Sequence, residues 1–183
     1  MEALVNNLGI ICRKVGFFKK SVIKTNKTAR TDSKSAKHIM QGNAFYNLGM
    51  FKKAIRAYKR ALKSNPNADN IHLNLANAYK SLGMLKEAVK SYKYVTHTNP
   101  NNAKAHYYLG LAYGKLGMHK QAKNSLNQSI TIDTNNANAH FNLAVIHLRL
   151  EDSTSATAEY RILNKLSPDL AGKLSEMMGN QQT

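Results

Sequence analysis

Four histidines stand at equal intervals in this sequence, and imidazole binds metals and transfers protons near neutral pH. They are His38, His72, His106 and His140, each 34 residues after the one before. Equivalent residues of stacked helical units lie roughly 10 Å apart, whereas a zinc–nitrogen bond is about 2 Å long. Two of these histidines therefore cannot share one metal ion. We predict no metal site and no cofactor, and we expect each ring to pack between helices.

Enzyme motifs are missing from the sequence. It contains no phosphate-binding loop, no HExxH, no nucleophile elbow and no clustered carboxylate pair. Gly110, Gly114 and Gly117 resemble a glycine motif, but they fall on positions of the same 34-residue period. We therefore predict that the protein is not an enzyme.

The 34-residue period extends well beyond the histidines. Glycine recurs at 49, 83 and 117, with Glu151 at the fourth position. Alanine recurs at 54, 88, 122 and 156, and proline at 66, 100 and 168, with Thr134 in the remaining place. A fixed period of this length indicates stacked copies of one supersecondary unit, and such stacks usually hold partners.

Residues 69–102 show what the unit is. Their first half has apolar residues at helical spacing and ends at Gly83, where a left-handed C-cap belongs. The second half repeats the spacing and ends at Asn99-Pro100, since proline cannot continue a helix. The unit is predicted to be a helix pair in which the small residues Ala76 and Ala88 allow close approach.

The unit resembles the tetratricopeptide repeat (TPR), which has this period. Leu109-Gly110 matches its Leu-Gly pair and Tyr79 and Tyr92 match its two aromatic positions, although histidine replaces the usual tryptophan. The resemblance implies an all-α, right-handed solenoid of antiparallel helix pairs. Its repeats are expected at 35–68, 69–102, 103–136 and 137–170.

Both ends of the stack are predicted to be irregular. The sequence GFFKKS at 16–21 aligns with GMFKKA at 49–54, so residues 1–34 are interpreted as a degenerate N-terminal repeat. Its poor second helix should dock weakly. Residues 171–183 are interpreted as a short cap or tail. Leu170, Leu174 and Met177 predict a short final turn over the last repeat, which leaves the end partly open.

Partner contacts in the TPR family lie on the first helix of each pair, on the inner, concave face. Transferred to this chain, these positions contain amides, cations and aromatic rings but no carboxylate. Amides suit an extended peptide backbone, cations attract carboxylates and aromatic rings serve as anchors. The predicted groove residues are Asn43, Asn47, Asn74, Asn77, Lys80, Lys104, Tyr107, Tyr108, Lys115, Phe141, Asn142 and Arg149. A chaperone-tail clamp is not expected, because its lysine position is filled by Ile39, Leu73, Tyr107 and Phe141.

Net charge is +17, and 13 of these charges fall in residues 1–68. Such a field attracts acidic proteins or peptides and permits peripheral contact with an anionic membrane. Nucleic acid is a less favoured partner, and solubility alone is the competing explanation. The single cysteine, Cys12, and the absence of a long apolar run indicate a cytoplasmic protein. The segment LGIICRKVGFF also permits a mitochondrial presequence, which its alignment with the repeats disfavours.

A weak terminal repeat can bury its apolar face on a second molecule, and head-to-tail contacts of this kind build open assemblies. We therefore expect a self-assembling scaffold. The chain also resembles the small TPR proteins associated with magnetosome membranes, which implies a peripheral coat on that membrane. The residues expected to mediate self-assembly are Ile10, Ile11, Val15, Phe17, Phe18, Val22 and Ile23.

Two alternatives stay open at this point. One is a monomeric adaptor for an acidic or extended peptide. The other is the repeat region of a larger enzyme such as an O-linked N-acetylglucosamine transferase, since Asn7, Asn74 and Asn142 resemble its asparagine ladder. Met40 and Tyr108 interrupt that ladder.

Overall fold

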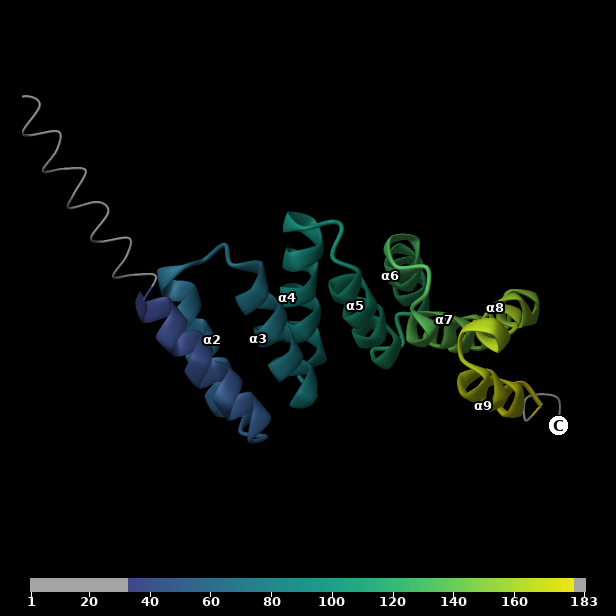
Figure 1. Ribbon diagram of the computed structural model, residues 1–183, viewed down its shortest axis with the longest axis horizontal. Helices are drawn as coiled ribbons and strands as arrows, with labels where there is room; N and C mark the ends of the chain where they lie inside the picture. Colours follow the sequence, from purple (N-terminus) through teal and green to yellow (C-terminus); the bar gives the residue numbers. More distant parts are fainter. Residues whose placement is uncertain (1–32, 180–183) are drawn as a thin grey trace, which may run out of the picture.

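The computed structural model describes residues 33–179, and this range is built from helices joined by short turns, without a strand. Successive helices lie side by side in one row (Figure 1). This confirms the predicted all-α solenoid of helix pairs. A helix over 33–47 is followed by α2 (Phe51–Ser64), α3 (Asp69–Ser81), α4 (Leu85–Thr98), α5 (Ala103–Lys115), α6 (His119–Ile132), α7 (Ala137–Arg149), α8 (Ser153–Leu166) and α9 (Pro168–Gly179).

The predicted N-terminal repeat at 1–34 lies outside the described residues except for its last two. The expected self-assembly residues, from Ile10 to Ile23, also lie outside them.

The turn inside each helix pair is closed by two backbone hydrogen bonds around a left-handed residue. After α3 the N–H of Met84 donates to the carbonyl of Tyr79 at 2.9 Å, and the N–H of Gly83 donates to that of Lys80 at 3.0 Å. Gly83 has φ +73°. Glycine adopts this conformation without steric cost, so the predicted C-cap is confirmed, and Gly49 and Gly117 repeat it at φ +70° and +73°.

Glu151 occupies the same left-handed position in the last helix pair, with φ 59°. Its side chain makes that conformation costly, so Glu151→Gly is expected to raise the free energy of unfolding by about 1 kcal/mol. Urea denaturation followed by circular dichroism measures the change. The matched control Gly83→Glu should lower stability by a similar amount. An unchanged midpoint for Glu151→Gly would show that Glu151 carries no strain.

Three of the evenly spaced histidines join the start of a helix pair to the connection before it. Nε2 of His72 lies 2.8 Å from the carbonyl oxygen of Pro66, and Nε2 of His106 lies 2.9 Å from that of Pro100. His140 repeats the contact with Thr134 at 3.0 Å. The His72 ring also packs on Tyr94, with ring centroids 3.9 Å apart. Three of the four rings thus hold the repeat together.

Small residues lie where the helices approach most closely, and large ones fill the space between repeats. Ala54, Ala88, Ala122 and Ala156 are all fully buried, and so is Ala76, as predicted. The second helices of the pairs supply four of the largest fully buried side chains, Tyr58, Tyr92, Leu126 and Leu163. This packing fixes the first helices in register and so positions the residues on their open face.

The C-terminal cap differs from its prediction. It is a 12-residue helix, α9, that begins at Pro168 rather than a short turn. Proline cannot continue α8, but its fixed φ suits the first position of a new helix. Ala171 and Leu174 are buried against the last repeat, and Met178 packs beside them. Met177 was expected in this contact and is instead 39% exposed. The last repeat is therefore covered more fully than the sequence suggested.

Candidate partner-binding groove

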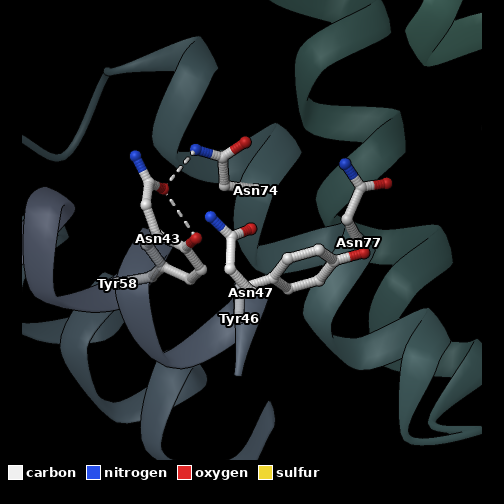
Figure 2. Close-up of a pocket in the computed structure, with 6 residues that line it drawn as sticks. All are labelled: Asn43, Tyr46, Asn47, Tyr58, Asn74 and Asn77. Carbon is white, nitrogen blue, oxygen red and sulfur yellow. Dashed lines mark hydrogen bonds between the residues drawn. The ribbon is translucent and has the colours of Figure 1, made fainter. Parts of the chain in front are cut away.

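Two pockets lie on the face formed by the first helices of the pairs. The N-terminal pocket has a volume of about 330 Å³ and contains four of the predicted residues, together with Tyr46 and Tyr58 (Figure 2). The four are Asn43, Asn47, Asn74 and Asn77. The C-terminal pocket has a similar volume of about 330 Å³ and contains Tyr107, Lys115, Asn142 and Arg149.

Buried tyrosines orient the asparagines of the N-terminal pocket. The Tyr58 hydroxyl donates to Oδ1 of Asn43 at 2.8 Å, and the Tyr92 hydroxyl donates to Oδ1 of Asn77 at 2.6 Å. Asn74 also donates to Oδ1 of Asn43, at 3.2 Å, as Figure 2 shows. A carbonyl oxygen has two lone pairs. Tyr58 and Asn74 donate to both of those on Oδ1 of Asn43, so this oxygen has no acceptor site left for a ligand.

This orientation changes what the pocket can recognise. The sequence suggests amides that both donate and accept. With Oδ1 of Asn43 and Asn77 engaged by tyrosines, the groups of these two amides left for a ligand are mainly Nδ2 donors. A ligand in this pocket is therefore favoured if it presents acceptors, such as peptide carbonyls or carboxylates.

Lys80 and Tyr108 line neither pocket and lie beside Tyr107 and Lys115 of the C-terminal pocket. Nζ of Lys80 is 4.2 Å from the centre of the Tyr108 ring, which is stacked on Tyr92 with centroids 5.9 Å apart. The ring of Tyr107 is next to that of Tyr108, at 5.2 Å. Burial lowers the pKa of Lys80, and the positive charge of Lys115 lowers it further. The centre of the groove therefore holds two repelling cations, which an anion would stabilise.

The C-terminal pocket has a more apolar floor. Leu111 and Val145 replace the asparagines of the earlier repeats, and Leu126 replaces the tyrosine. Gly110 leaves the space for this floor, because a Cβ there would lie 2.7 Å from Cγ of the buried Leu126. Lys115 and Arg149 remain at its polar rim. This end of the groove suits an apolar side chain beside a carboxylate.

Three predicted residues differ in their placement from the rest. Lys104 is exposed on α5 and lines neither pocket. Phe141 is partly buried against the core of the last repeat, so much of its ring is already covered. Asn142 donates to the carbonyl of Asn138 at 2.7 Å, and its contact with the Tyr107 hydroxyl is longer, at 3.4 Å. Its free group is consequently the oxygen.

Sequence reasoning missed the tyrosine beneath each asparagine. The signal was present in the repeat, because Asn43 precedes Tyr58 by 15 residues and Asn77 precedes Tyr92 by the same interval. In the third repeat both partners are replaced, by Leu111 and Leu126.

The buried tyrosine hydroxyls also predict a loss of stability at high pH. Burial raises the pKa of Tyr58 from 10.0 to about 12, with a smaller effect from Tyr46, and burial raises the pKa of Tyr92 as well. Between pH 10 and about 12 the folded chain keeps a proton on Tyr58 that the unfolded chain loses. The free energy of unfolding should therefore be insensitive to Tyr58 below pH 10 and fall above it.

Urea denaturation at a series of pH values measures this fall. Tyr58→Phe removes one of the two groups and should make the decline between pH 10 and 12 shallower. A decline of unchanged steepness in Tyr58→Phe would contradict the assignment to Tyr58.

The described residues contain no group of three His, Cys, Asp or Glu side chains close enough to hold a metal ion. The nearest approach to one is a pair in which Nδ1 of His140 lies 2.6 Å from Oε2 of Glu159, away from both pockets. Within the same range, no helix is long and apolar enough to cross a membrane.

Comparison with known proteins agrees with the geometry. Family models described as TPR repeat and tetratricopeptide repeat match residues 42–83, 76–117 and 103–136, which together span just over half of the 183 residues. No curated protein sequence matches the chain.

Several solved structures are similar to this one. A crystal structure of MamA is 27% identical, covers 75% of this chain and 84% of its own, and has a TM-score of 0.69. A second MamA crystal structure is 25% identical over 81% of this chain and 84% of its own, with a TM-score of 0.74. The first TPR of Spaghetti (RPAP3), bound to the HSP90 peptide SRMEEVD, shares the fold at 24% identity and a TM-score of 0.63, over 65% of this chain and 94% of its own.

The helix pairs, the repeat period and the family match lead to the same conclusion. TPR domains are interaction modules rather than catalysts, and the described residues follow their architecture throughout. The chain is a member of the tetratricopeptide repeat family and a protein-interaction scaffold.

Proposed function

We propose that the groove binds an extended, acidic segment of a partner protein. The observation that carries this proposal is the orientation of Asn43 and Asn77, whose amide donors are left available because tyrosine hydroxyls occupy their oxygens. Peptide carbonyls along an extended segment supply the matching acceptors.

Charge supports an acidic ligand. Lys80 and Lys115 repel each other at the centre of the groove, and Arg149 lies at the rim of the C-terminal pocket. No carboxylate lines either pocket. The peptide in the similar RPAP3 structure, SRMEEVD, is acidic as well.

Fluorescence anisotropy tests this proposal. A labelled peptide rich in Asp and Glu should bind, and the same peptide with Asn and Gln in their place should bind at least tenfold more weakly. Asn77→Leu, which removes the amide donor, should weaken the binding of both peptides by the same factor. Equal affinity of the wild-type chain for the two peptides would contradict the acidic preference.

We also propose that the chain self-associates through its N-terminal segment, with Phe17 and Phe18 in the contact. Support comes from an exposed apolar side chain near the start of the described range. Leu48, on the turn after the first described helix, is 69% exposed, whereas its equivalents Leu82 and Leu116 are partly buried. An apolar surface of this kind favours cover by the N-terminal segment or by a second molecule.

Light scattering after size exclusion distinguishes this assembly from the alternative, a monomeric adaptor. The full chain should form an oligomer that resists salt, and Phe17→Ser with Phe18→Ser should reduce it to monomers. A monomeric wild-type chain would leave the adaptor as the better description.

Peripheral association with an anionic membrane is the third part of the proposal. The net charge of +17 and the similarity to MamA structures, which the resemblance links to magnetosome membranes, support it.

A further inference from the structure

The outward face of α2 carries a continuous stripe of cations. Its six basic residues are all exposed, and the helix contains no acidic residue. Their spacing places them on one side of the helix, opposite the buried Ala54 and Tyr58, over a length of about 16 Å. The stripe consists of Lys52, Lys53, Arg56, Lys59, Arg60 and Lys63.

Helix α4 continues the stripe. The repeat places Lys86, Lys90 and Lys93 at the positions equivalent to Lys52, Arg56 and Lys59, and all three are exposed. The cations of α2 and α4 therefore form two rows at equivalent positions of successive repeats. We call the six α2 residues and these three the α2–α4 basic face.

The basic face is not neutralised by carboxylates. Among the described residues, the carboxylate contacts within ion-pair distance are made by His140 and His147, on α7, and none is made by a lysine or arginine. Glu87 is the one acidic residue on α4, and it is partly buried. Lys53 and Lys59 lie over the rings of Phe45 and Tyr79, at 5.6 and 5.8 Å, contacts that leave their charge unneutralised. The positive charge of this face is therefore available to an external anionic partner.

The charge is a local feature of these two helices rather than a property of every repeat. On α6 the positions equivalent to Arg56 and Lys59 are Asn124 and Asn127. On α8 the positions equivalent to Lys52 and Arg56 are Thr154 and Ala158. A demand for solubility alone would not concentrate the charge at one end of the stack.

We propose that the α2–α4 basic face binds the anionic headgroups of a lipid bilayer, an inference that rests on the membrane association proposed above. Seven of its nine cations are lysines, which act as compact charges without the directional fork of arginine. Clusters of this size on a helix suit anionic lipids.

Exposed methionines favour a bilayer over a nucleic acid. Met50 is 43% exposed and Met84 is 39% exposed, and each lies immediately before α2 or α4, two residues from Lys52 or Lys86. The beginnings of both helices lie at the lower edge of the molecule in Figure 1. Apolar side chains beside lysines can enter the interfacial layer of a membrane, whereas single-stranded nucleic acids favour aromatic rings for stacking.

Vesicle co-sedimentation of the full chain tests the inference. The chain should bind phosphatidylcholine vesicles that contain about one-third phosphatidylserine, should ignore phosphatidylcholine alone, and should bind less as salt rises. Lys52→Gln, Arg56→Gln and Lys59→Gln combined should weaken binding by about a hundredfold. These residues are exposed, so circular dichroism should report an unchanged fold.

A matched variant supplies the control. Arg161→Gln, Lys165→Gln and Lys173→Gln remove the same charge from exposed positions at the far end of the stack, and binding should fall by less than about tenfold. Equal losses in the two variants would overturn the inference and leave net charge as the cause. Stronger binding to a duplex oligonucleotide than to the anionic vesicles at equal salt would also overturn it.

The outcomes separate this inference from the functions proposed above. A wild-type chain that ignores anionic vesicles would overturn the membrane association and the inference together. Binding that the α2 variant leaves unchanged would overturn the inference alone. Acidic-peptide binding depends on the first helices of the pairs, so the α2 variant should retain it.

Discussion

A Tyr92→Ala variant is expected to lose about 3–5 kcal/mol of its free energy of unfolding. The Tyr92 ring is fully buried on α4, stacks on Tyr108 and ends in a 2.6 Å hydrogen bond to Asn77. Its removal leaves a cavity between the second and third repeats and frees the Asn77 amide to turn. Urea denaturation followed by circular dichroism gives the change directly.

Two controls separate the ring from its hydroxyl. Tyr92→Phe keeps the packing and should cost about 1 kcal/mol, the value of one hydrogen bond. Tyr160→Ala removes the equivalent residue of the last repeat, which is only partly buried, and should cost less than Tyr92→Ala. If Tyr92→Ala and Tyr160→Ala lost the same stability, burial of Tyr92 would not be the reason for its effect.

Reversing the charge at the centre of the groove should have the largest effect on partner binding. Lys80→Glu combined with Lys115→Glu is expected to weaken the binding of an acidic peptide by at least a hundredfold, because like charges in contact cost several kcal/mol. Lys80 is partly buried over the Tyr108 ring, so its charge is less screened than that of an exposed lysine. Isothermal titration calorimetry with the labelled Asp- and Glu-rich peptide measures the loss.

The matched control changes the same charge elsewhere. Lys104→Glu with Lys173→Glu alters two exposed lysines that line neither pocket, and affinity should fall by less than about tenfold. A similar loss in both double variants would mean that the peptide responds to net charge and not to Lys80 and Lys115.

The fold could be predicted from the sequence because residues within each repeat mark where its helices begin and end. Gly49, Gly83 and Gly117 mark turns whose left-handed φ excludes most other residues, and Pro66 and Pro100 mark where the second helices end. Buried alanines at a fixed interval mark the closest approach of helices. These are local constraints, so one sequence is sufficient to read them.

The details of the groove depend on contacts between positions that no local pattern connects. The direction of the Asn43 amide is set by a hydroxyl from α2 and an amide from α3. The partial burial of Phe141 depends on its packing against the core of the last repeat, and α9 begins at a proline that the repeat pattern reads only as a stop. Periodicity alone could not have supplied these features.

From α2 to α9, each helix contacts chiefly its neighbours in the row, and the larger contacts that skip a helix join α5 to α7 and α7 to α9. Small rotations between successive helix pairs add up along such a stack. They change the pitch of the superhelix without breaking any single contact between helices. The tight turns at Gly49, Gly83 and Gly117 keep each helix pair stiff, so the compliance lies between pairs. The distance between the two pockets therefore changes when the helix pairs rotate relative to one another. A segment bound in both pockets can fix that distance through its own length.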